Sequence, residues 1–263
     1  MRAKFMREVA SLGLPPGPGE AALVTPHDLE GLPEPAERFF RFMGVVGKPR
    51  DWSFRLALEG RFRRTPAEAW MRCRAWQYNS SLSVARIFHL KLSLGGLLPV
   101  VGRDTYLEGR GRMLIRLFDL FTVGDGAGEA YDLGELVTYL NDAVAIAPSM
   151  LLGPAVSFSP VGANAFGVAL ADSGHLARAT VSVDGRGAPT NFESSDRFCA
   201  DPKDPRKVTR ARWSTPVGGW QEIAGRRLFG RGQAVWHLDE GEFAYADFTP
   251  LPATLAFNVR PGT

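Results

Sequence analysis

Cysteine is scarce in this chain, because its 263 residues include only Cys73 and Cys199. Two cysteines so far apart cannot form the disulfide framework of a small secreted domain, and they are typical of a reducing compartment. Long apolar runs are also missing: the longest uncharged stretch, residues 143–160, is interrupted by Pro148 and Pro154. A membrane-spanning helix needs about 20 consecutive apolar residues. We therefore expect a soluble, cytoplasmic protein without a transmembrane segment.

Histidine is nearly as rare, and its four copies, at positions 27, 89, 175 and 237, are widely separated. No pair has the H-x-H or H-E-x-x-H spacing of a metal site. The G-x-S-x-G pattern of serine hydrolases and the G-x-G-x-x-G pattern of dinucleotide-binding folds are absent too. The sequence therefore predicts neither a metal nor an organic cofactor.

Positive charge is present, but it is not concentrated. The chain has 31 Lys and Arg residues, of which only 5 are Lys, against 28 Asp and Glu residues, for a formal net charge of +3. The arginines are interspersed with acids, and no predicted helix gathers them on one face, as a nucleic-acid-binding element would. We therefore expect no nucleic-acid partner.

Most of the chain has the period-2 alternation of β-strands. Phe54, Leu56 and Leu58 alternate with Arg55, Ala57 and Glu59, for example. Further strands are expected at 69–78, 84–92, 103–109, 111–118, 155–159, 164–171, 176–184, 190–199, 208–214, 232–238, 242–248 and 254–259. A sheet with so many short strands must curl or close. The predicted fold is mainly β (α+β): a curved antiparallel sheet that forms a half-open barrel with a helical lid.

One long helix interrupts the strands. Asp132 is expected at its N-cap with Glu135 three residues later, which is the pattern of a capping box, and Pro148 is expected to end it. Its apolar stripe consists of Leu136, Leu140, Ala143 and Ala147. Residues 14–35 are rich in Pro and Gly, so we expect an N-terminal arm over residues 1–35 and a single half-barrel domain over residues 36–263.

The strand at 69–78 carries the most distinctive surface. Its aromatic and basic residues project to one face and its small residues to the other; the former are Trp70, Arg72, Arg74, Trp76 and Tyr78. We call these five the aromatic–arginine stripe. It could line the concave side and bind a ligand with a flat apolar body and an anionic head. The commoner use of such aromatic–arginine pairs is to brace the outer face of a sheet, here with Met71, Cys73 and Ala75 turned to the core.

Two sets of polar residues are candidates for chemistry. Glu135, Tyr139 and Asp142 share one face of the predicted helix, where they could form a buried hydrogen-bond network or an acid–base site. Asp104 and Tyr106 share one strand face, with Arg103 on the other. A charge inside a barrel must be neutralised, so buried pairing of Arg103 with Asp104 and of Asp196 with Arg197 is the simplest interpretation.

Several motifs occur together in order. They are Leu32-Pro-Glu-Pro35, Arg103-Asp-x-Tyr106, Tyr139-Leu-Asn-Asp142, Ala147-Pro148, Phe192-Glu-Ser-Ser-Asp-Arg197, Gly225-Arg-Arg-Leu228, Ala234-Val-Trp236 and Gly241-Glu-Phe-Ala-Tyr245. In these motifs, from Leu32 onward, the chain resembles a bacterial family known as a domain of unknown function. Many members of that family carry N-terminal hydrophobic segments, and this chain has none, which favours a soluble form. By fold, the family looks like the half-barrels of bacterial lipoprotein carriers (LolA-like) and of the cofactor-free enzyme VioE.

Three functions follow as alternatives. The leading one is a carrier or sequestering protein for a hydrophobic, amphiphilic or aromatic small molecule, bound in the concave cavity. Its predicted ligand-binding residues are Trp70, Arg72, Arg74, Trp76, Tyr78, Tyr139, Trp236 and Tyr245. The second is a cofactor-independent enzyme (cyclase, isomerase or dehydratase) that uses Asp104, Tyr106 and Asp142 as acid–base groups. The third is a structural or partner-binding domain. The sequence leaves the oligomeric state open.

Overall fold

The strands pair antiparallel in the computed structural model, which describes residues 1–94, 98–201, 204 and 206–263. Its main sheet has 15 strands, of which 13 follow one another in the order β6-β5-β4-β3-β2-β1-β16-β15-β11-β10-β9-β8-β7. β12 pairs with β15, β17 pairs with β1, and β13 and β14 form a separate two-stranded sheet. The strand bounds are β1 Ser53–Phe62, β2 Met71–Ser80, β3 Ala85–Leu94, β4 Leu98–Leu107, β5 Arg110–Leu117, β6 Phe121–Ala127, β7 Val156–Gly162, β8 Ala165–Asp172, β9 His175–Val183, β10 Pro189–Ala200, β11 Val208–Ser214, β12 Val217–Gly218, β13 Gln221–Ile223, β14 Arg226–Leu228, β15 Arg231–Leu238, β16 Gly241–Pro250 and β17 Ala256–Phe257.

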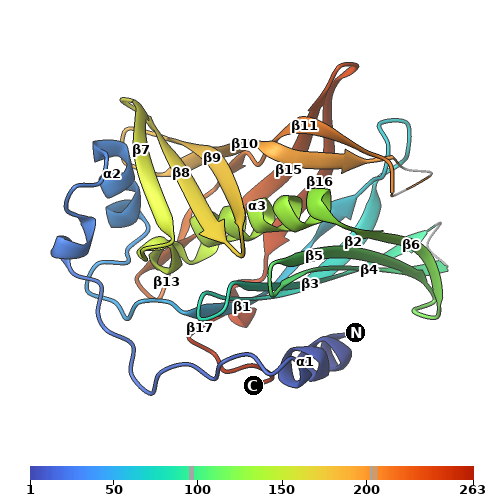
Figure 1. The fold of residues 1–263 in the computed structure, drawn as a ribbon, viewed down its shortest axis with the longest axis horizontal. Helices are drawn as coiled ribbons and strands as arrows, with labels where there is room; N and C mark the ends of the chain where they lie inside the picture. Colours follow the sequence, from blue (N-terminus) through green and yellow to red (C-terminus); the bar gives the residue numbers. More distant parts are fainter. Residues whose placement is uncertain (95–97, 202–203, 205) are drawn as a thin grey trace.

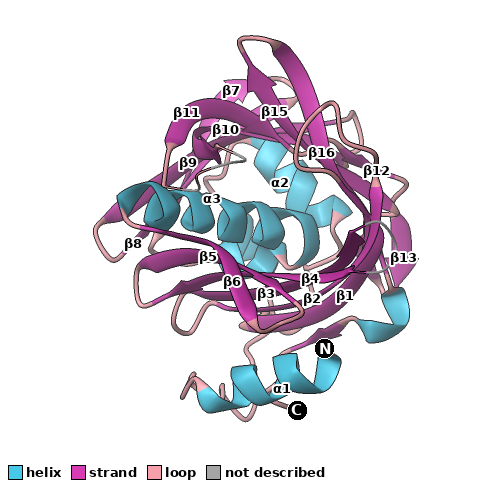
Figure 2. Ribbon diagram, turned by 90° about the vertical axis from the view of Figure 1, so that its right-hand side faces the viewer, coloured by secondary structure: helices cyan, strands magenta, loops and turns pink. Residues whose placement is uncertain are grey.

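The sheet curls around one helix, α3 (Glu129–Ile146), which runs through its concave side (Figures 1 and 2). This helix connects the two edge strands of the sheet, because β6 precedes it and β7 follows it. It packs against β4 and β5 on one side and against β9 and β10 on the other. The predicted fold class, a curved antiparallel half-barrel with a helix on its open side, is confirmed.

Burial on nearly all sides distinguishes α3 from a surface helix. Its fully buried residues include Leu136, Val137, Leu140 and Ala143, and they belong to the main core. The predicted capping box is wrong. The helix begins after Gly128, whose φ of 108° lies in a region that favours glycine, and Asp132 lies one turn inside it. The Asp132 carboxylate instead accepts a hydrogen bond from the Gly111 backbone N–H at 2.7 Å, which ties the helix to β5.

Two glycines let the first turn of α3 approach the sheet closely. A Cβ on Gly111 of β5 would collide with the backbone oxygen of Tyr131, and one on Gly126 of β6 would collide with the ring of the same tyrosine. Only glycine at these two positions lets the backbone of the helix come so close to the strands.

The first residues form helix α1 (Arg2–Ser11), which the sequence analysis did not predict. It lies on the outer side of the sheet, away from α3 (Figure 1), where Phe5 and Val9 pack with Tyr78 and Ile87. The rest of the predicted arm contains only the short 3-10 turn Pro26–Leu29 before α2 (Glu34–Phe42) begins. The other 3-10 turns are Pro148–Leu151 and Pro252–Thr254.

The predicted strands agree with the structure apart from the short β12, β13 and β14, which were not predicted, and two further places. β6 was not predicted, because Gly124 and Gly126 interrupt the apolar alternation that identifies a strand. The strand expected at 254–259 is only the two-residue β17, preceded by a 3-10 turn. No helix in the described part of the chain is long and apolar enough to cross a membrane.

Candidate functional site

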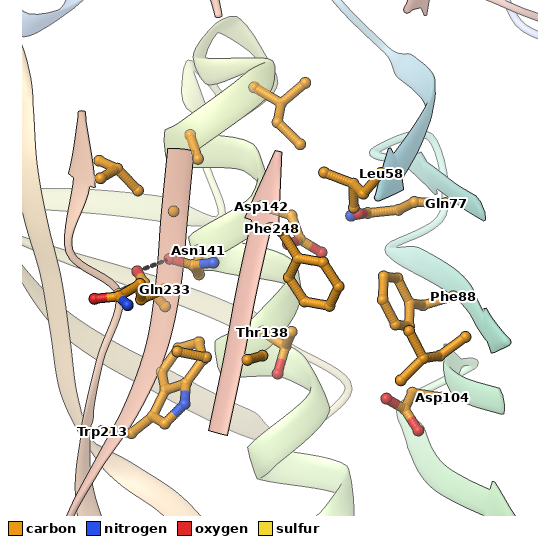
Figure 3. A pocket seen from close by; sticks show the side chains of 18 of the residues that line it. Leu58, Gln77, Phe88, Asp104, Thr138, Asn141, Asp142, Trp213, Gln233 and Phe248 are labelled. Carbon is orange, nitrogen blue, oxygen red and sulfur yellow. Dashed lines mark hydrogen bonds between the residues drawn. The ribbon is translucent and has the colours of Figure 1, made fainter. Parts of the chain in front are cut away.

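A cavity of about 160 Å³ lies between α3 and the concave face of the sheet (Figure 3). One wall is mainly apolar and comes from the strands; it includes Leu58, Phe62, Phe88, Leu90, Trp213, Tyr245 and Phe248. The opposite wall is α3, which contributes Glu135, Thr138, Asn141 and Asp142. Arg86, Asp104 and Arg197 extend the polar lining onto the sheet. The cavity thus has an aromatic side and a charged side.

Arg86 is the centre of the charged side, and its side chain is only 5% exposed. Its Nε donates to Asp142 Oδ2 at 2.7 Å and its Nη1 donates to Glu135 Oε2 at 2.9 Å. Asn79 Nδ2 donates a weaker bond to the same Asp142 oxygen at 3.4 Å. Burial alone would lower the pKa of Arg86, but the surrounding carboxylates outweigh it and raise that pKa above its usual value. Arg86 therefore stays charged, and it holds two carboxylates of α3 in place.

Asp142 is consequently a fixed group. Burial raises the pKa of its carboxyl, and the ion pair with Arg86 opposes the rise without cancelling it. One carboxylate oxygen already accepts hydrogen bonds from Arg86 and Asn79. A carboxylate held in this way is suited to orienting Arg86 rather than to exchanging protons with a ligand.

Arg197 forms the second cationic group of the lining. Its Nη1 donates to the Gly134 carbonyl oxygen at 2.6 Å and also to the Thr138 hydroxyl, both on α3. Its guanidinium lies 4.7 Å from the ring centre of Trp213 and 5.5 Å from that of Trp236, which is cation–π geometry. Arg197 thus ties β10 to the helix and to two aromatic rings.

Asp104 differs from the other carboxyls because it faces the cavity without a fixed cation. Within the part of the chain that the structure describes, no arginine forms an ion pair with it. Burial and the nearby Glu135 carboxylate raise the pKa of Asp104 to about 7, and Arg86 and Arg197 only partly oppose that rise. Asp104 therefore changes charge near neutral pH.

The register of the sheet places Asp104 beside an aromatic ring. Phe88 of β3 is its direct partner on β4, and Gln77 of β2 is the partner of Phe88. Side chains directly opposite each other in an antiparallel pair have Cβ atoms about 4.5–5.5 Å apart. All three line the cavity, and Figure 3 shows them together on the sheet side, across from Thr138 and Asp142 of α3.

Of the predicted acid–base residues, the cavity brings together Asp104 and Asp142 but not Tyr106. The Tyr106 hydroxyl is directed to another partner, Asp172 Oδ2, at 2.7 Å. Burial and this carboxylate raise the pKa of Tyr106 far above its usual range. Tyr106 therefore belongs to the packing between strands and not to the cavity wall.

Of the predicted ligand-binding residues, Tyr245 lines the cavity. Trp236 lies directly behind it, in a stacked arrangement with ring centres 6.0 Å apart. The Tyr245 hydroxyl accepts a hydrogen bond from Trp213 Nε1 at 3.1 Å, so its position is fixed. Tyr139 is buried in the main core and is not part of the cavity lining in the described part of the chain.

The aromatic–arginine stripe lies on the outer face of the sheet, so it does not line the cavity. Arg72 and Arg74 are exposed, while Cys73 and Ala75 are turned to the core. Trp70 is covered by the guanidiniums of Arg61 and Arg63, at 4.7 and 4.6 Å from its ring centre. Trp76 and Tyr78 pack near α1, and the Tyr78 hydroxyl donates to the Val259 carbonyl oxygen at 3.2 Å. The bracing arrangement that the sequence left open is the one present.

The predicted dipeptide pairs are wrong, because neighbouring strand residues point to opposite faces. Arg103 pairs with Glu8 of α1 on the outside, while Asp104 faces the cavity. Asp196 pairs with Arg210, while Arg197 points to α3. Within each dipeptide the two side chains therefore have different surroundings, and they do not pair with each other.

Arg86 is the important residue that the sequence analysis missed. Its signal was present: Arg86 occupies the same strand face as Phe88, Leu90 and Leu92, and an arginine on an otherwise apolar face needs buried partners. Glu135 was expected to cap the helix, and its role as a partner of Arg86 was not predicted. Trp213 was not singled out either, although it lines the cavity.

A sequence comparison identifies the family. The profile of a Family of unknown function (DUF6544) matches residues 22–248, which is most of the chain and contains every motif from Leu32 to Tyr245. The chain belongs to this family. The family resemblance predicted from the motifs is thereby confirmed, whereas no curated protein matches the chain in sequence.

Solved structures with similar folds include a LolA superfamily protein from Nitrosomonas europaea, with 11% identity and a TM-score of 0.44 over 89% of this chain and 93% of that one. A putative outer membrane lipoprotein-sorting protein domain from Vibrio parahaemolyticus has 7% identity and a TM-score of 0.40, over 78% and 85% of the two chains. A β-barrel-like protein of a domain of unknown function (DUF1849) from Brucella abortus has 10% identity and a TM-score of 0.34, over 79% and 98%.

Proposed function

We propose that this protein binds a small, partly aromatic molecule in the cavity between α3 and the sheet, as a carrier or sequestering protein. The observation that carries the proposal is the division of this cavity into an aromatic wall and a charged wall. A buried cavity with a few converging polar groups is the usual form of a small-molecule site. The aromatic wall supplies contact area and the polar wall supplies orientation.

The volume limits the size of the ligand. An engineered apolar cavity of about 150 Å³ in another protein holds one benzene molecule. The cavity here, of about 160 Å³, therefore has room for one ring with a short substituent. This ligand is smaller than the one expected from the aromatic–arginine stripe, which was a flat apolar body with an anionic head.

Two tryptophans provide a matched test of the binding site. Trp213 lines the cavity, while Trp76 lies on the outer face near α1. We expect Trp213→Leu to weaken binding of a small aromatic probe such as benzyl alcohol several-fold, because one ring contact contributes about 0.5–1.5 kcal/mol beyond area burial. Trp76→Leu should leave the affinity unchanged. Isothermal titration and native mass spectrometry of the freshly purified protein are the measurements.

Folding must be separated from binding in this test, because Trp213 is deeply buried and Arg197 packs on it. Phe88→Leu serves as a second cavity variant, since it shortens the aromatic wall while keeping an apolar side chain at the site. Each variant is compared with the parent by near-UV circular dichroism. Equal probe affinity in the parent, Trp213→Leu and Phe88→Leu would refute the cavity as the binding site.

A second candidate function is acid–base catalysis on the bound molecule, and Asp104 is the observation that favours it. A catalytic carboxyl works best when its pKa is near the working pH, and the pKa of Asp104 is raised to about 7. Tyr106 and Asp142 take no direct part in this version, because Asp172 and Arg86 engage them. An enzyme should change a co-purified small molecule on incubation, as followed by mass spectrometry, and Asp104→Asn should stop that change.

The cytoplasmic location stays a prediction. Both cysteines are free thiols in the structure, which is consistent with a reducing compartment. Cell fractionation with an antibody against this chain is the direct measurement.

A further inference from the structure

The charges that line the cavity are unequal. Three carboxyls, of Asp104, Glu135 and Asp142, face two guanidiniums, of Arg86 and Arg197. Arg86 is shared by Glu135 and Asp142, and Arg197 lies 3.8 Å from Glu135 while it also binds the helix carbonyl of Gly134. Both guanidiniums therefore already have partners within the protein, although the Nε of Arg197 has none among the described residues. Asp104 is left as the carboxyl without a fixed counter-charge in the described part of the chain.

We propose that the ligand carries a positively charged nitrogen, such as a protonated amine on a short arm of an aromatic ring, and that Asp104 binds this nitrogen. The inference rests on the proposed function and specifies the chemical class of its ligand. A single ligand cation beside Asp104, together with the two guanidiniums, balances the negative charge of the three carboxylates in the lining. An anion would add a further negative charge to the same small cavity.

The surroundings of Asp104 fit a cation in a second way. Phe88 is the cross-strand partner of Asp104, and Phe88 lies in edge-to-face contact with Phe248, with ring centres 6.2 Å apart. Both rings line the cavity. A cation near an aromatic face gains about 0.5–2 kcal/mol, with the larger values in desolvated sites. The Phe88 ring already carries the Arg86 guanidinium, 4.9 Å from its centre, so Phe248 is the ring that is left for a ligand nitrogen held by Asp104.

The competing occupant is a carboxylate that would bind Arg197. The Nε of Arg197 is buried and has no hydrogen-bond partner among the described residues, so it could receive an anionic oxygen. Glu135 stands 3.8 Å from the Nη1 of the same guanidinium, however, and would repel that oxygen. The charge balance therefore favours a cation, and the experiment compares the two ligand classes directly.

Binding of a cation should depend on pH through Asp104. The ionisable groups that face Asp104 are Arg86 on β3, Tyr131 and Glu135 on α3, Arg197 on β10 and Tyr245 on β16. Since the pKa of Asp104 is about 7, most of the carboxyl is neutral at pH 6 and ionised at pH 8. A cation binds the ionised form, so its affinity should rise about tenfold between these pH values. Binding at pH 6 should also release close to one proton.

Three probes of similar size separate the alternatives: benzylamine, benzyl alcohol and benzoate. We expect benzylamine, which stays protonated at both pH values, to bind most tightly at pH 8 in isothermal titration. The preference for benzylamine over benzyl alcohol should disappear in Asp104→Asn. It should persist in Asp125→Asn, a matched control on β6 whose carboxylate is exposed and pairs with Arg112.

The outcomes distinguish this inference from the proposed function. If benzyl alcohol or benzoate binds at least as tightly as benzylamine at pH 8, the ligand is not a cation, and the cavity remains a binding site. If none of the three probes binds, the proposed function falls, and the inference falls with it. Should Asp104→Asn fail to fold, the test remains with the parent protein. A benzylamine affinity that does not change between pH 6 and pH 8 overturns the role of Asp104.

Discussion

At the scale of single residues, the cavity depends on which carboxyls have a fixed partner. Asp142 and Glu135 are held by Arg86, with heavy-atom distances of 2.7 and 2.9 Å, whereas Asp104 is not. The three carboxyls of the lining therefore have two different roles. Removing Arg86 would leave buried carboxylates without a partner, which typically costs about 3–5 kcal/mol. Removing the Asp104 charge should have the opposite effect on stability.

We expect Asp104→Asn to stabilise the fold at pH 8 and to change little at pH 4. The pKa of Asp104 is raised from 3.8 to about 7, so between these values the folded protein binds more protons than the unfolded chain. The free energy of unfolding contributed by Asp104 therefore falls as pH rises from about 4 to 7. Asparagine cannot ionise and avoids that loss. Thermal unfolding at both pH values should show a Tm gain of a few degrees at pH 8 only.

Asp125→Asn is again the matched control, because the exposed Asp125–Arg112 pair should contribute at most about 1 kcal/mol. An unchanged or lower Tm for Asp104→Asn at pH 8 would mean that the Asp104 carboxylate has a stabilising partner.

The alternation along β4 made part of this residue-level arrangement predictable. It places Asp104 and Tyr106 on one face and Arg103 on the other, as the structure has them. The partners were not predictable, since Arg103 pairs with Glu8, 95 residues away in sequence. A strand pattern gives the face of a residue and not the identity of what packs against that face.

At the scale of elements, helix α3 makes a very close contact with β5 and β6. The first turn of the helix approaches β5 and β6 where Gly111 and Gly126 have no side chain. This close approach was not predicted, because it depends on a crossover that brings residue 131 beside residue 111.

We expect Gly111→Ala to destabilise the protein by about 1–3 kcal/mol or more, because the new methyl group would collide with the Tyr131 carbonyl. Gly153→Ala is the control: nothing lies within 4 Å of its Cβ position, so the change should stay within about 0.5 kcal/mol. Urea unfolding measures both. Equal stability of the two variants would show that α3 can shift away from β5 without cost.

Helix α1 should detach in acid. Burial alone would raise the pKa of Glu8, but hydrogen bonds from His89 and Arg103 outweigh it and hold that pKa below 4.5. A lowered folded-state pKa gives stability that is present above the unfolded value and is lost as pH falls through the folded one. Hydrogen exchange should therefore show loss of protection over Arg2–Ser11 below about pH 4.5, before the main sheet opens.

Glu8→Gln offers the comparison for this helix, since it keeps the size of the side chain and removes its charge. Its α1 should already exchange faster at pH 7. If the exchange of α1 in the parent does not depend on pH between 3 and 7, Phe5 and Val9 hold the helix without help from Glu8.

At the scale of the whole molecule, the sequence predicted a curved sheet but not the direction of its curvature. Alternation in β2 separates Trp76 and Tyr78 from Cys73 and Ala75 equally well for either direction. The decision depends on where α3 packs, and therefore on the two edge strands that it connects. The fold class could therefore be predicted correctly from the sequence. The face of the sheet on which the aromatic–arginine stripe lies could not, so both interpretations stayed open.

The distribution of charge over the whole surface decides whether the protein binds nucleic acids. Many surface arginines are paired with acids, as in the Arg231–Asp247 and Arg210–Asp196 ion pairs at 2.6 and 2.5 Å. We expect no retention of a fluorescent 30-base-pair DNA or RNA at physiological salt, because neutralised arginines release few counterions from phosphates. Fluorescence anisotropy over a salt series measures this. Micromolar affinity with a steep salt dependence would contradict it.

The pairing of β1 with β16 has a consequence for the order of folding. These strands lie side by side, with Leu58 opposite Pro250, although most of the chain lies between them in sequence. The hairpins from β1 to β6 can form as soon as they leave the ribosome, but β1 has no neighbour on its other side until β16 is synthesised. Contacts of such sequence separation slow folding. For most of synthesis the nascent chain therefore presents β1 as an open strand edge. We expect chaperones to bind this edge in the cell.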